Sequence, residues 1–230
     1  MLTYNVNWGA PRPDLALQII EESNAEIVCL QETTPEWERY LRQNLGSKYP
    51  SMEFRSSEGR MGGGLAFLST VPMAEVSYIP SETGWFDGWI KSFRTEAGPV
   101  QVLNVHLRPP VGDRGSWSLG GYFCTGDERL AELQRFCGAM VTNVPAIVAG
   151  DFNDTKGSAP LKWLKKQAYT NALPEFDRHS PTWRWRVGPI HLRRRMDHIV
   201  YSPGLRCCAA EVIPAGASDH FPVLATFANE

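Results

Sequence analysis

The sequence predicts an α+β domain in which two packed β-sheets carry helices on their outer faces. The chain has 230 residues, of which 43% are hydrophobic and 21% charged, a composition typical of a soluble globular protein with a substantial core. Short apolar runs recur along its whole length and outnumber the segments with helical periodicity. No linker, repeat or change in composition interrupts the chain, so we expect a single domain over residues 1–230.

Strands are predicted where short apolar runs lie between Gly, Pro, Asn and Asp residues. Several runs are almost wholly apolar, which is typical of strands that are covered on both faces. The segment 96–99 is expected to be a turn that joins two strands into an antiparallel hairpin. The predicted strands are residues 2–6, 27–31, 64–69, 74–79, 89–94, 100–107, 146–149, 196–201, 205–212 and 222–227.

Helices are predicted where apolar residues recur every three to four positions and so form one stripe. In residues 35–45 this stripe contains Trp37, Tyr40 and Leu41, and Gly46 is a suitable residue to end the helix. The other predicted helices are residues 14–23, 127–142 and 159–166. Residues 108–126 and 170–195 show neither pattern, so we expect two long irregular loops of the kind that often bind ligands.

Charge and cysteine content exclude several classes of protein. A net charge of −2 argues against a strongly basic nucleic-acid coat or a polybasic membrane binder, although a local basic groove remains possible. No apolar run is long enough to span a membrane, and we expect a monomer in the cytoplasm. The 5 cysteines form no C-x-x-C motif, which argues against a disulfide framework or a zinc site. The chain begins inside a predicted strand, so a leader or anchor could precede it.

Polar residues gather at the ends of the predicted apolar strands. They are Asn5 and Asn7, Gln31 and Glu32, Asn104 and His106, Asp151 and Asn153, Asp197 and His198, and Ser218, Asp219 and His220. One such residue would be explained as a helix cap or a turn residue. The repetition of Asn, Asp, Glu and His at so many strand ends predicts one shared site.

The residue types in this set point to metal-assisted hydrolysis of a phosphate ester. Carboxylate and amide oxygens are hard ligands that suit Mg²⁺, Mn²⁺ or Ca²⁺. The sequence contains no His-Glu-x-x-His motif of a zinc protease and no Gly-x-Ser-x-Gly elbow of a serine hydrolase. The glycines at 62–64 lack the Lys-Ser/Thr that completes a nucleotide-binding loop. A hard cation beside carboxylates and histidines can neutralise the charge that develops on a phosphate.

The set resembles the endonuclease/exonuclease/phosphatase superfamily, which includes DNase I-like nucleases, neutral sphingomyelinases and inositol polyphosphate 5-phosphatases. The matching segments occur in the order of that family and span nearly the whole chain. They are Tyr4-Asn5-Val6-Asn7, Leu30-Gln31-Glu32, Asn104-Val105-His106-Leu107, Gly150-Asp151-Phe152-Asn153, Arg195-Met196-Asp197-His198-Ile199 and Ser218-Asp219-His220-Phe221-Pro222. The resemblance implies a four-layer αββα sandwich of two packed mixed β-sheets flanked by helices, with the site at one end.

The resemblance also implies a metal site. Glu32 would be the principal ligand, Asn5 would assist it, and Asp219 would support the same region. The cation would be Mg²⁺ or Mn²⁺, with Ca²⁺ as a further candidate. Nuclease relatives often carry Asp at the position of Asn7, and the neutral residue here would weaken metal affinity and favour one metal over two.

Catalytic roles follow from the same resemblance. Asp151 would orient or activate the attacking water, and Asn153 would bind the phosphate. Asp197 and His220 would form a hydrogen-bonded dyad that faces the phosphate. His106 would contact a phosphoryl oxygen or the leaving group. Which of these residues acts as general acid, general base or electrostatic stabiliser is disputed for the family, and the sequence does not decide it.

Substrate contacts are predicted for Asn104 and Arg195. Asn104 could instead hold the backbone at a strand end. Arg195 lies two residues before Asp197, so it would share its face if the strand extends that far, and it could grip a phosphate. Trp183 and Trp185 alternate with arginines, either as a stacking surface for bases or as anchors of the loop.

Three functions are consistent with these residues. The first is a metal-dependent phosphodiesterase or phosphatase that acts on a nucleic acid, nucleotide, phospholipid or sugar phosphate. The second is a DNA or RNA nuclease proper, which the arginine–tryptophan segment favours. The third is a catalytically inactive binding module, which the intact Glu32, Asp151, Asp197 and His220 argue against.

Overall fold

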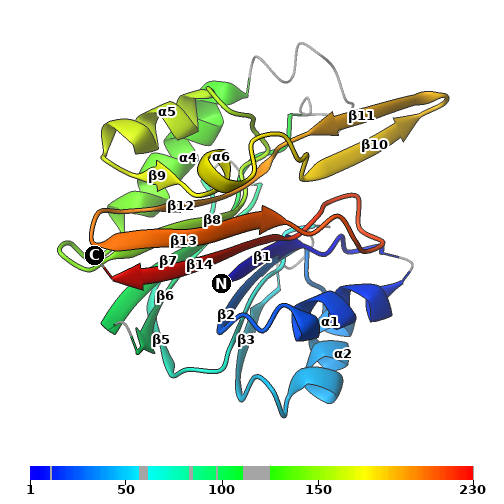
Figure 1. Ribbon diagram of the computed structural model, residues 1–230, viewed down its shortest axis with the longest axis horizontal. Helices are drawn as coiled ribbons and strands as arrows, with labels where there is room; N and C mark the ends of the chain where they lie inside the picture. Colours follow the sequence, from blue (N-terminus) through cyan, green and yellow to red (C-terminus); the bar gives the residue numbers. More distant parts are fainter. Residues whose placement is uncertain (11, 57–61, 83–84, 97, 111–124, 230) are drawn as a thin grey trace.

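Two six-stranded β-sheets pack face to face, and helices cover both outer faces of the pair (Figure 1). The computed structural model describes residues 1–10, 12–56, 62–82, 85–96, 98–110 and 125–229. This arrangement confirms the predicted four-layer αββα sandwich of two mixed sheets. No helix among the described residues has the length and apolar character needed to cross a bilayer.

The first sheet combines strands from the two ends of the chain. It contains β1 (Leu2–Asn5), β2 (Ile27–Gln31), β3 (Ser51–Arg55), β4 (Leu65–Ser69), β13 (Leu205–Val212) and β14 (Val223–Asn229), in the order β13-β14-β1-β2-β4-β3. Strand β1 pairs in parallel with β2 and antiparallel with β14, so the N-terminal strand lies in the middle of the sheet. The sequence did not predict β3, because this strand at the sheet edge carries polar residues.

The second sheet has the order β5-β6-β7-β8-β12-β9. Its strands are β5 (Met73–Ile79), β6 (Gly88–Thr95), β7 (Gly98–His106), β8 (Ala146–Asp151), β9 (Thr170–Asn171) and β12 (Asp197–Tyr201). Strands β6 and β7 form the predicted antiparallel hairpin, although Ala97 in its turn lies outside the described residues. Strands β7 and β8 are parallel, which brings the carboxyl ends of both to the same edge.

The helices cover the two outer faces. Helices α1 (Pro13–Glu22) and α2 (Pro35–Leu45) pack on the first sheet, and α4 (Gly126–Gly138) and α5 (Ala159–Lys166) pack on the second. The Thr34 side chain accepts a hydrogen bond from the Trp37 N–H and so caps α2 at its N-terminus. Helix α4 ends at Gly138, before the predicted residue 142, and the N–H of Ala139 closes its last turn.

Strand alternation explains why the functional residues lie between the sheets. In β2, Ile27 and Cys29 point into the layer between the two sheets, and Gln31 continues the same row. In β8, Ile147 and Ala149 do the same, and Asp151 continues their row. The inter-sheet layer is therefore apolar along most of its length and becomes polar at one end of the sandwich.

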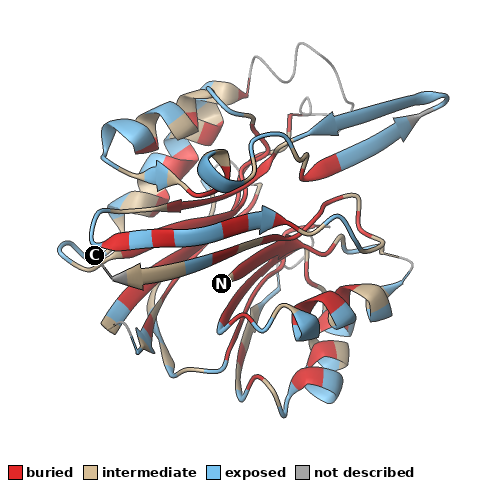
Figure 2. Ribbon diagram, in the orientation of Figure 1, coloured by how far each residue is buried: buried red, intermediate tan, exposed pale blue. Residues whose placement is uncertain are grey.

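The prediction of a long irregular loop at 170–195 was wrong. This segment contains β9, the short helix α6 (Leu173–Phe176) and a two-stranded hairpin of β10 (Trp183–Val187) and β11 (Ile190–Arg194). The hairpin projects from the body of the molecule and is largely exposed (Figures 1 and 2). Its residues form no apolar run because most of them, including all of β11, are exposed. The other predicted loop lies mostly outside the described residues, including Trp117, Tyr122 and Phe123.

Candidate active site

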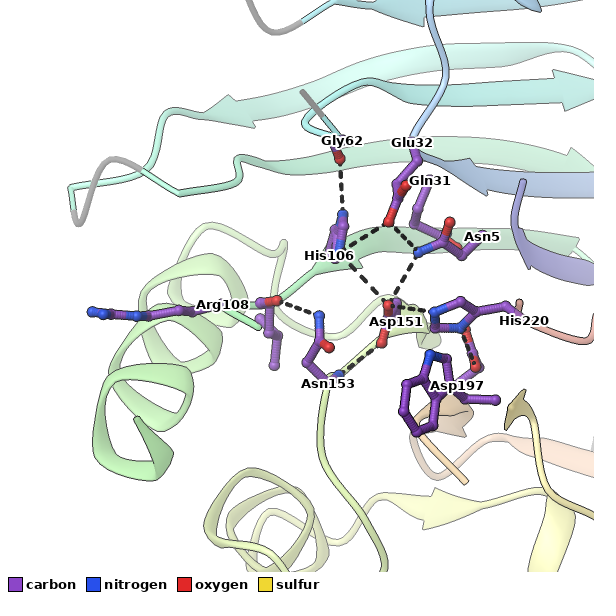
Figure 3. Close-up of polar contacts among 12 residues, drawn as sticks. Asn5, Gln31, Glu32, Gly62, His106, Arg108, Asp151, Asn153, Asp197 and His220 are labelled. Atoms are coloured by element: carbon purple, nitrogen blue, oxygen red, sulfur yellow. Dashed lines mark hydrogen bonds and ion pairs between the residues drawn. The ribbon is translucent and has the colours of Figure 1, made fainter. Parts of the chain in front are cut away.

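The ends of three neighbouring strands place catalytic candidates in one row. His106 at the end of β7 is the Cα partner of Asp151 at the end of β8. Asp151 is in turn the partner of Asp197, which begins β12. Directly paired residues point to the same face of a sheet, so the three side chains project together into the inter-sheet layer (Figure 3).

Asn5 connects this row to the opposite sheet. Its Nδ2 donates to Glu32 Oε1 at 2.9 Å and to Asp151 Oδ2 at 3.1 Å. Its own backbone carbonyl accepts a hydrogen bond of 2.8 Å from the Ser218 hydroxyl. A single amide therefore holds together two carboxylates that come from different sheets (Figure 3).

Glu32 is fixed by an unusual backbone conformation. Its φ is +61°, in the left-handed region that residues other than glycine rarely adopt. Asn7 and Asn153, which also border the site, have φ values of +57° and +50°. Glu32 Oε2 accepts from the Trp8 N–H at 3.3 Å. Such conformations concentrate at functional sites, where the surrounding structure holds them in place.

The site carries more negative than positive charge. Burial raises the pKa of Glu32, although the hydrogen bond from Asn5 opposes this. Burial and the nearby Asp197 raise the pKa of Asp151 to about 6, although His220 and His106 oppose this. Among the described residues, no lysine or arginine forms an ion pair with Glu32, Asp151 or Asp219. Buried carboxylates without such partners are the donor set that a hard cation requires.

His106 is held as a neutral base. Its Nδ1 lies 3.1 Å from the Gly62 carbonyl, which can only accept, so Nδ1 carries the proton. The other nitrogen, Nε2, lies 3.6 Å from Asp151 Oδ2 and 4.0 Å from Glu32 Oε1. Burial lowers the pKa of His106 to about 4. The Phe86 ring stacks on the imidazole with centroids 3.8 Å apart, a contact that no sequence pattern indicated.

His220 and Asp197 are in direct contact. His220 Nδ1 lies 2.9 and 3.1 Å from the two Asp197 oxygens, and Nε2 lies 3.5 Å from Asp151 Oδ2. Burial opposes protonation of His220, but Asp197 and Asp151 outweigh burial and raise its pKa well above the ordinary value. The Thr182 hydroxyl accepts from the Asp197 N–H at 2.9 Å and positions this carboxylate.

Asp151, Asp197 and His220 offer ligand atoms that all lie within 4.8 Å of one another. A cation could be placed among them on distance alone. A protonated His220 would repel it, however, and its Nδ1 already bonds to Asp197. The contacts of His220 therefore fit the transfer of a proton better than the binding of a metal ion.

Asp219 borders the site from the loop that precedes His220. Its Oδ1 accepts from Asn7 Nδ2 at 2.8 Å, and its Oδ2 accepts from Trp183 Nε1 at 3.2 Å. The neutral residue at position 7 therefore serves as a donor to Asp219, whereas an aspartate there would repel it. Trp183 is buried and anchors the hairpin, which is the second of the two roles that the sequence suggested for it.

Asn153 lies beside Asp151 at the start of the following loop. Its N–H donates to Asp151 Oδ1 at 2.8 Å, and its Nδ2 donates to the Leu107 carbonyl at 2.9 Å. Asp154, the next residue, pairs with the buried Arg129 at 3.0 Å. This loop is therefore tied both to β7 and to α4.

Two predicted substrate contacts are not at the site. Asn104 is fully buried; its Nδ2 donates to the Leu30 and Ala66 carbonyls at 3.1 Å, and its Oδ1 accepts from Gln31 Nε2 at 2.7 Å. It bridges the sheets one step behind His106. Strand β12 begins only at Asp197, so strand alternation does not place Arg195. Its guanidinium instead bonds to the Ser180 carbonyl at 2.8 Å and to Asp177 at 3.4 Å.

A sequence profile described as the Endonuclease/Exonuclease/phosphatase family matches residues 2–220. The chain belongs to this family. It is also 30% identical over 169 residues to the inositol phosphosphingolipids phospholipase C of Saccharomyces cerevisiae. That match covers 64% of this chain and 34% of the yeast protein, so the chain spans about a third of the length of this relative.

Solved structures share the fold. The endonuclease/exonuclease/phosphatase from Beutenbergia cavernae superposes with a TM-score of 0.73 and 19% identity, covering 99% of this chain and 70% of that one. Truncated TDP2 of Caenorhabditis elegans gives 0.72 and 18% identity over 98% and 96% of the two chains. The beta toxin of Staphylococcus aureus gives 0.72 and 19% identity over 98% of each. At these identities the likeness shows the fold alone.

Proposed function

We propose that this chain hydrolyses a phosphate ester with the help of a divalent hard cation, Mg²⁺ or Mn²⁺. The observation that carries the proposal is the convergence of Glu32, Asp151 and the Asp197–His220 pair at one end of the inter-sheet layer. The name of the family covers enzymes that cleave phosphate esters, which supports the same class of reaction. We also infer one domain over residues 1–230, because β1 and β14 share a sheet.

Glu32 would hold the cation, with the Asn5 amide and Asp219 at the same end of the site. When bound, the cation supplies positive charge that offsets the negative charge of the phosphate. The raised pKa of Glu32, which burial causes, fits a carboxylate whose natural partner is a cation.

The remaining residues orient water and move protons. Asp151 has a pKa of about 6 because of burial, so near neutral pH it can hold an attacking water and accept its proton. Protonated His220 points Nε2 toward Asp151 and can donate to a phosphoryl oxygen, while Asp197 stabilises the imidazolium. Neutral His106 presents Nε2 on the other side of Asp151, where it can contact the phosphate or the leaving group.

The substrate is proposed to be a phosphodiester. The named activity of the yeast relative is that of a phospholipase C on inositol phosphosphingolipids, which favours a lipid headgroup ester. A nuclease is the second candidate, because arginines of the β10–β11 hairpin lie beside the site and could contact a nucleic-acid backbone.

A panel of phosphate esters tests the proposal. Purified protein is assayed with bis(4-nitrophenyl) phosphate, 4-nitrophenyl phosphate, sphingomyelin, inositol phosphosphingolipid, single-stranded DNA and RNA, each in Mg²⁺, Mn²⁺, Ca²⁺ or EDTA. We expect turnover of at least one diester in Mg²⁺ or Mn²⁺ and none in EDTA, with Asp151→Asn as the inactive control. Equal activity of wild type and Asp151→Asn, or full activity in EDTA, would overturn it.

A further inference from the structure

The β10–β11 hairpin has one cationic and one apolar face. Its register pairs Arg184 with Arg193 and Arg186 with His191, and paired residues share a face. The opposite face carries Trp183, Trp185, Ile190, Leu192 and Arg194. Both faces reach the border of the candidate active site at the base of the hairpin, since Trp183 Nε1 donates to Asp219 Oδ2 at 3.2 Å and Arg184 donates to the Ser218 carbonyl at 3.3 Å.

A pocket of about 500 Å³ lies between the hairpin and the loop that carries Asp219. Arg184, Trp185, Arg186 and His191 line one side of it. Asn7 and Asp219 line the other side, and both border the candidate active site. The pocket therefore borders the candidate active site through Asn7 and Asp219.

The cationic wall is fixed relative to the site. Arg184 donates to the Gly216 carbonyl at 2.9 Å and the Ser218 carbonyl at 3.3 Å, and its guanidinium lies 4.5 Å from the centre of the Phe221 ring. Its backbone N–H donates to the Asp219 carbonyl at 2.9 Å. These contacts dock the base of the hairpin on the loop between Gly216 and Phe221.

Arg186 is the residue best placed to meet a ligand in this pocket. It is exposed, and its Nε donates to the Gly188 carbonyl at 3.1 Å within the same hairpin. The carboxylate of Asp219 also lines the pocket, but its two oxygens accept from Asn7 and Trp183. Guanidinium groups bind phosphate through two parallel hydrogen bonds, which makes arginine suited to this task.

We propose that this pocket binds a second phosphate of the substrate, next to the phosphate ester that is cleaved. The inference rests on the proposed phosphodiesterase activity and adds a preference for substrates that carry a second phosphate next to the one that is cleaved. Such a pair occurs in a polynucleotide backbone and in a phosphorylated inositol headgroup. Arg186 and His191 determine this specificity without taking part in the bond cleavage.

Two pairs of substrates test the proposal and distinguish the two sources. The first pair is thymidine 5′-(4-nitrophenyl phosphate) with and without a 3′-phosphate. The second is glycerophosphoinositol with and without a phosphate on the inositol ring. We expect the added phosphate to lower KM by roughly tenfold in at least one pair, because one charge-assisted hydrogen bond at a partly exposed site changes affinity by about this factor.

Variants assign this gain to the pocket. Arg186→Gln should abolish the KM advantage of the second phosphate and leave kcat and the KM of the unmodified partner unchanged. His191→Gln should reduce the advantage in part. Arg194→Gln removes the same charge from the opposite face of the same hairpin and should keep the advantage. An equal loss in Arg186→Gln and Arg194→Gln would mean general charge attraction and would overturn the proposal.

A binding measurement separates this inference from the proposed function. Calorimetry compares thymidine 3′,5′-bisphosphate with thymidine 5′-monophosphate on wild type and Arg186→Gln in Mg²⁺. Tighter binding of the bisphosphate to wild type alone supports the pocket even if no diester is hydrolysed. Equal binding of the two nucleotides together with equal KM values in both substrate pairs would refute the pocket, while turnover of any diester would leave the proposed activity standing.

Discussion

His220 lies between two carboxylates, with Nδ1 2.9 Å from Asp197 Oδ2 and Nε2 3.5 Å from Asp151 Oδ2. Asp197 and Asp151 belong to adjacent strands, and their Cα atoms are direct partners in the sheet. One imidazole therefore links two carboxylates of adjacent strands. We expect Asp197 and His220 to act as a unit for this reason.

The first prediction concerns that unit. Asp197→Asn and His220→Ala should each lower kcat by about two to four orders of magnitude, because each removes the proton that the dyad presents. The double variant should lose about as much as the worse single variant, since residues that share one step are not additive. Steady-state kinetics of the four proteins measure this coupling. Losses that multiply in the double variant would show that the two residues perform separate tasks.

The second prediction concerns the cation. Glu32→Gln keeps the size of the side chain but removes the charge, and its single carbonyl oxygen can accept from Asn5 or from Trp8 but not from both. We expect the Mg²⁺ concentration for half-maximal activity to rise by about tenfold or more, with a smaller change in kcat at saturating Mg²⁺. Titration of activity with Mg²⁺ measures this. Glu36→Gln, on the exposed side of α2, is the matched control and should leave the titration unchanged.

Alternation along the strands explains how much of this site the sequence could predict. The apolar rows of β7 and β8 end in His106 and Asp151, and Glu32 directly follows β2, so the strand-end pattern alone predicts that these three residues lie near one another. The same pattern could not distinguish Asn104 from His106, since both lie on one face of β7. Only the packing of the first sheet against β7 shows that Asn104 lies behind the site.

Contacts between distant segments were not accessible from sequence. The predicted direction of the Arg195 side chain depended on where β12 begins. The strand begins at Asp197, two residues after Arg195, so alternation along the strand does not apply to Arg195. Phe86 and Thr182 come from segments without periodicity, and their contacts with His106 and Asp197 depend on how those segments pack. The hairpin was missed because an exposed strand needs no apolar run.

The third prediction uses His198, which lies on the helix-facing side of β12 and away from the catalytic row. Asn171 Nδ2 donates to His198 Nδ1 at 2.9 Å, and His198 Nε2 donates to the Asp154 carbonyl at 3.1 Å. Both nitrogens are thus used in the neutral form. Burial, together with Arg195, lowers the pKa of His198 to about 4.

The sign of the resulting pH dependence follows from linkage. Between about pH 6.5 and pH 4 the unfolded chain binds a proton at this histidine that the folded protein does not, so stability falls as pH decreases through that window. His198→Gln removes this contribution. The stability advantage of wild type over His198→Gln should therefore shrink by about 2 kcal/mol from pH 7 to pH 5. Urea unfolding of both proteins at the two pH values measures it, and a constant difference would contradict the assigned pKa.

The last prediction separates a structural role of Asn104 from a substrate contact. Asn104→Ala removes the side-chain donor to the Leu30 and Ala66 carbonyls and leaves the Gln31 amide with the Thr3 hydroxyl as its remaining acceptor inside the sandwich. We expect a loss of about 2–4 kcal/mol in the free energy of unfolding, the usual consequence of unpaired buried polar groups. KM should stay within about twofold of wild type, because the side chain is fully buried behind His106. Gln101→Ala is the matched control: it lies on the same strand, and its amide bonds to the Val141 and Val144 carbonyls at the far end of the sheet. A KM that rises in Asn104→Ala but not in an equally destabilised Gln101→Ala would restore Asn104 to the substrate site.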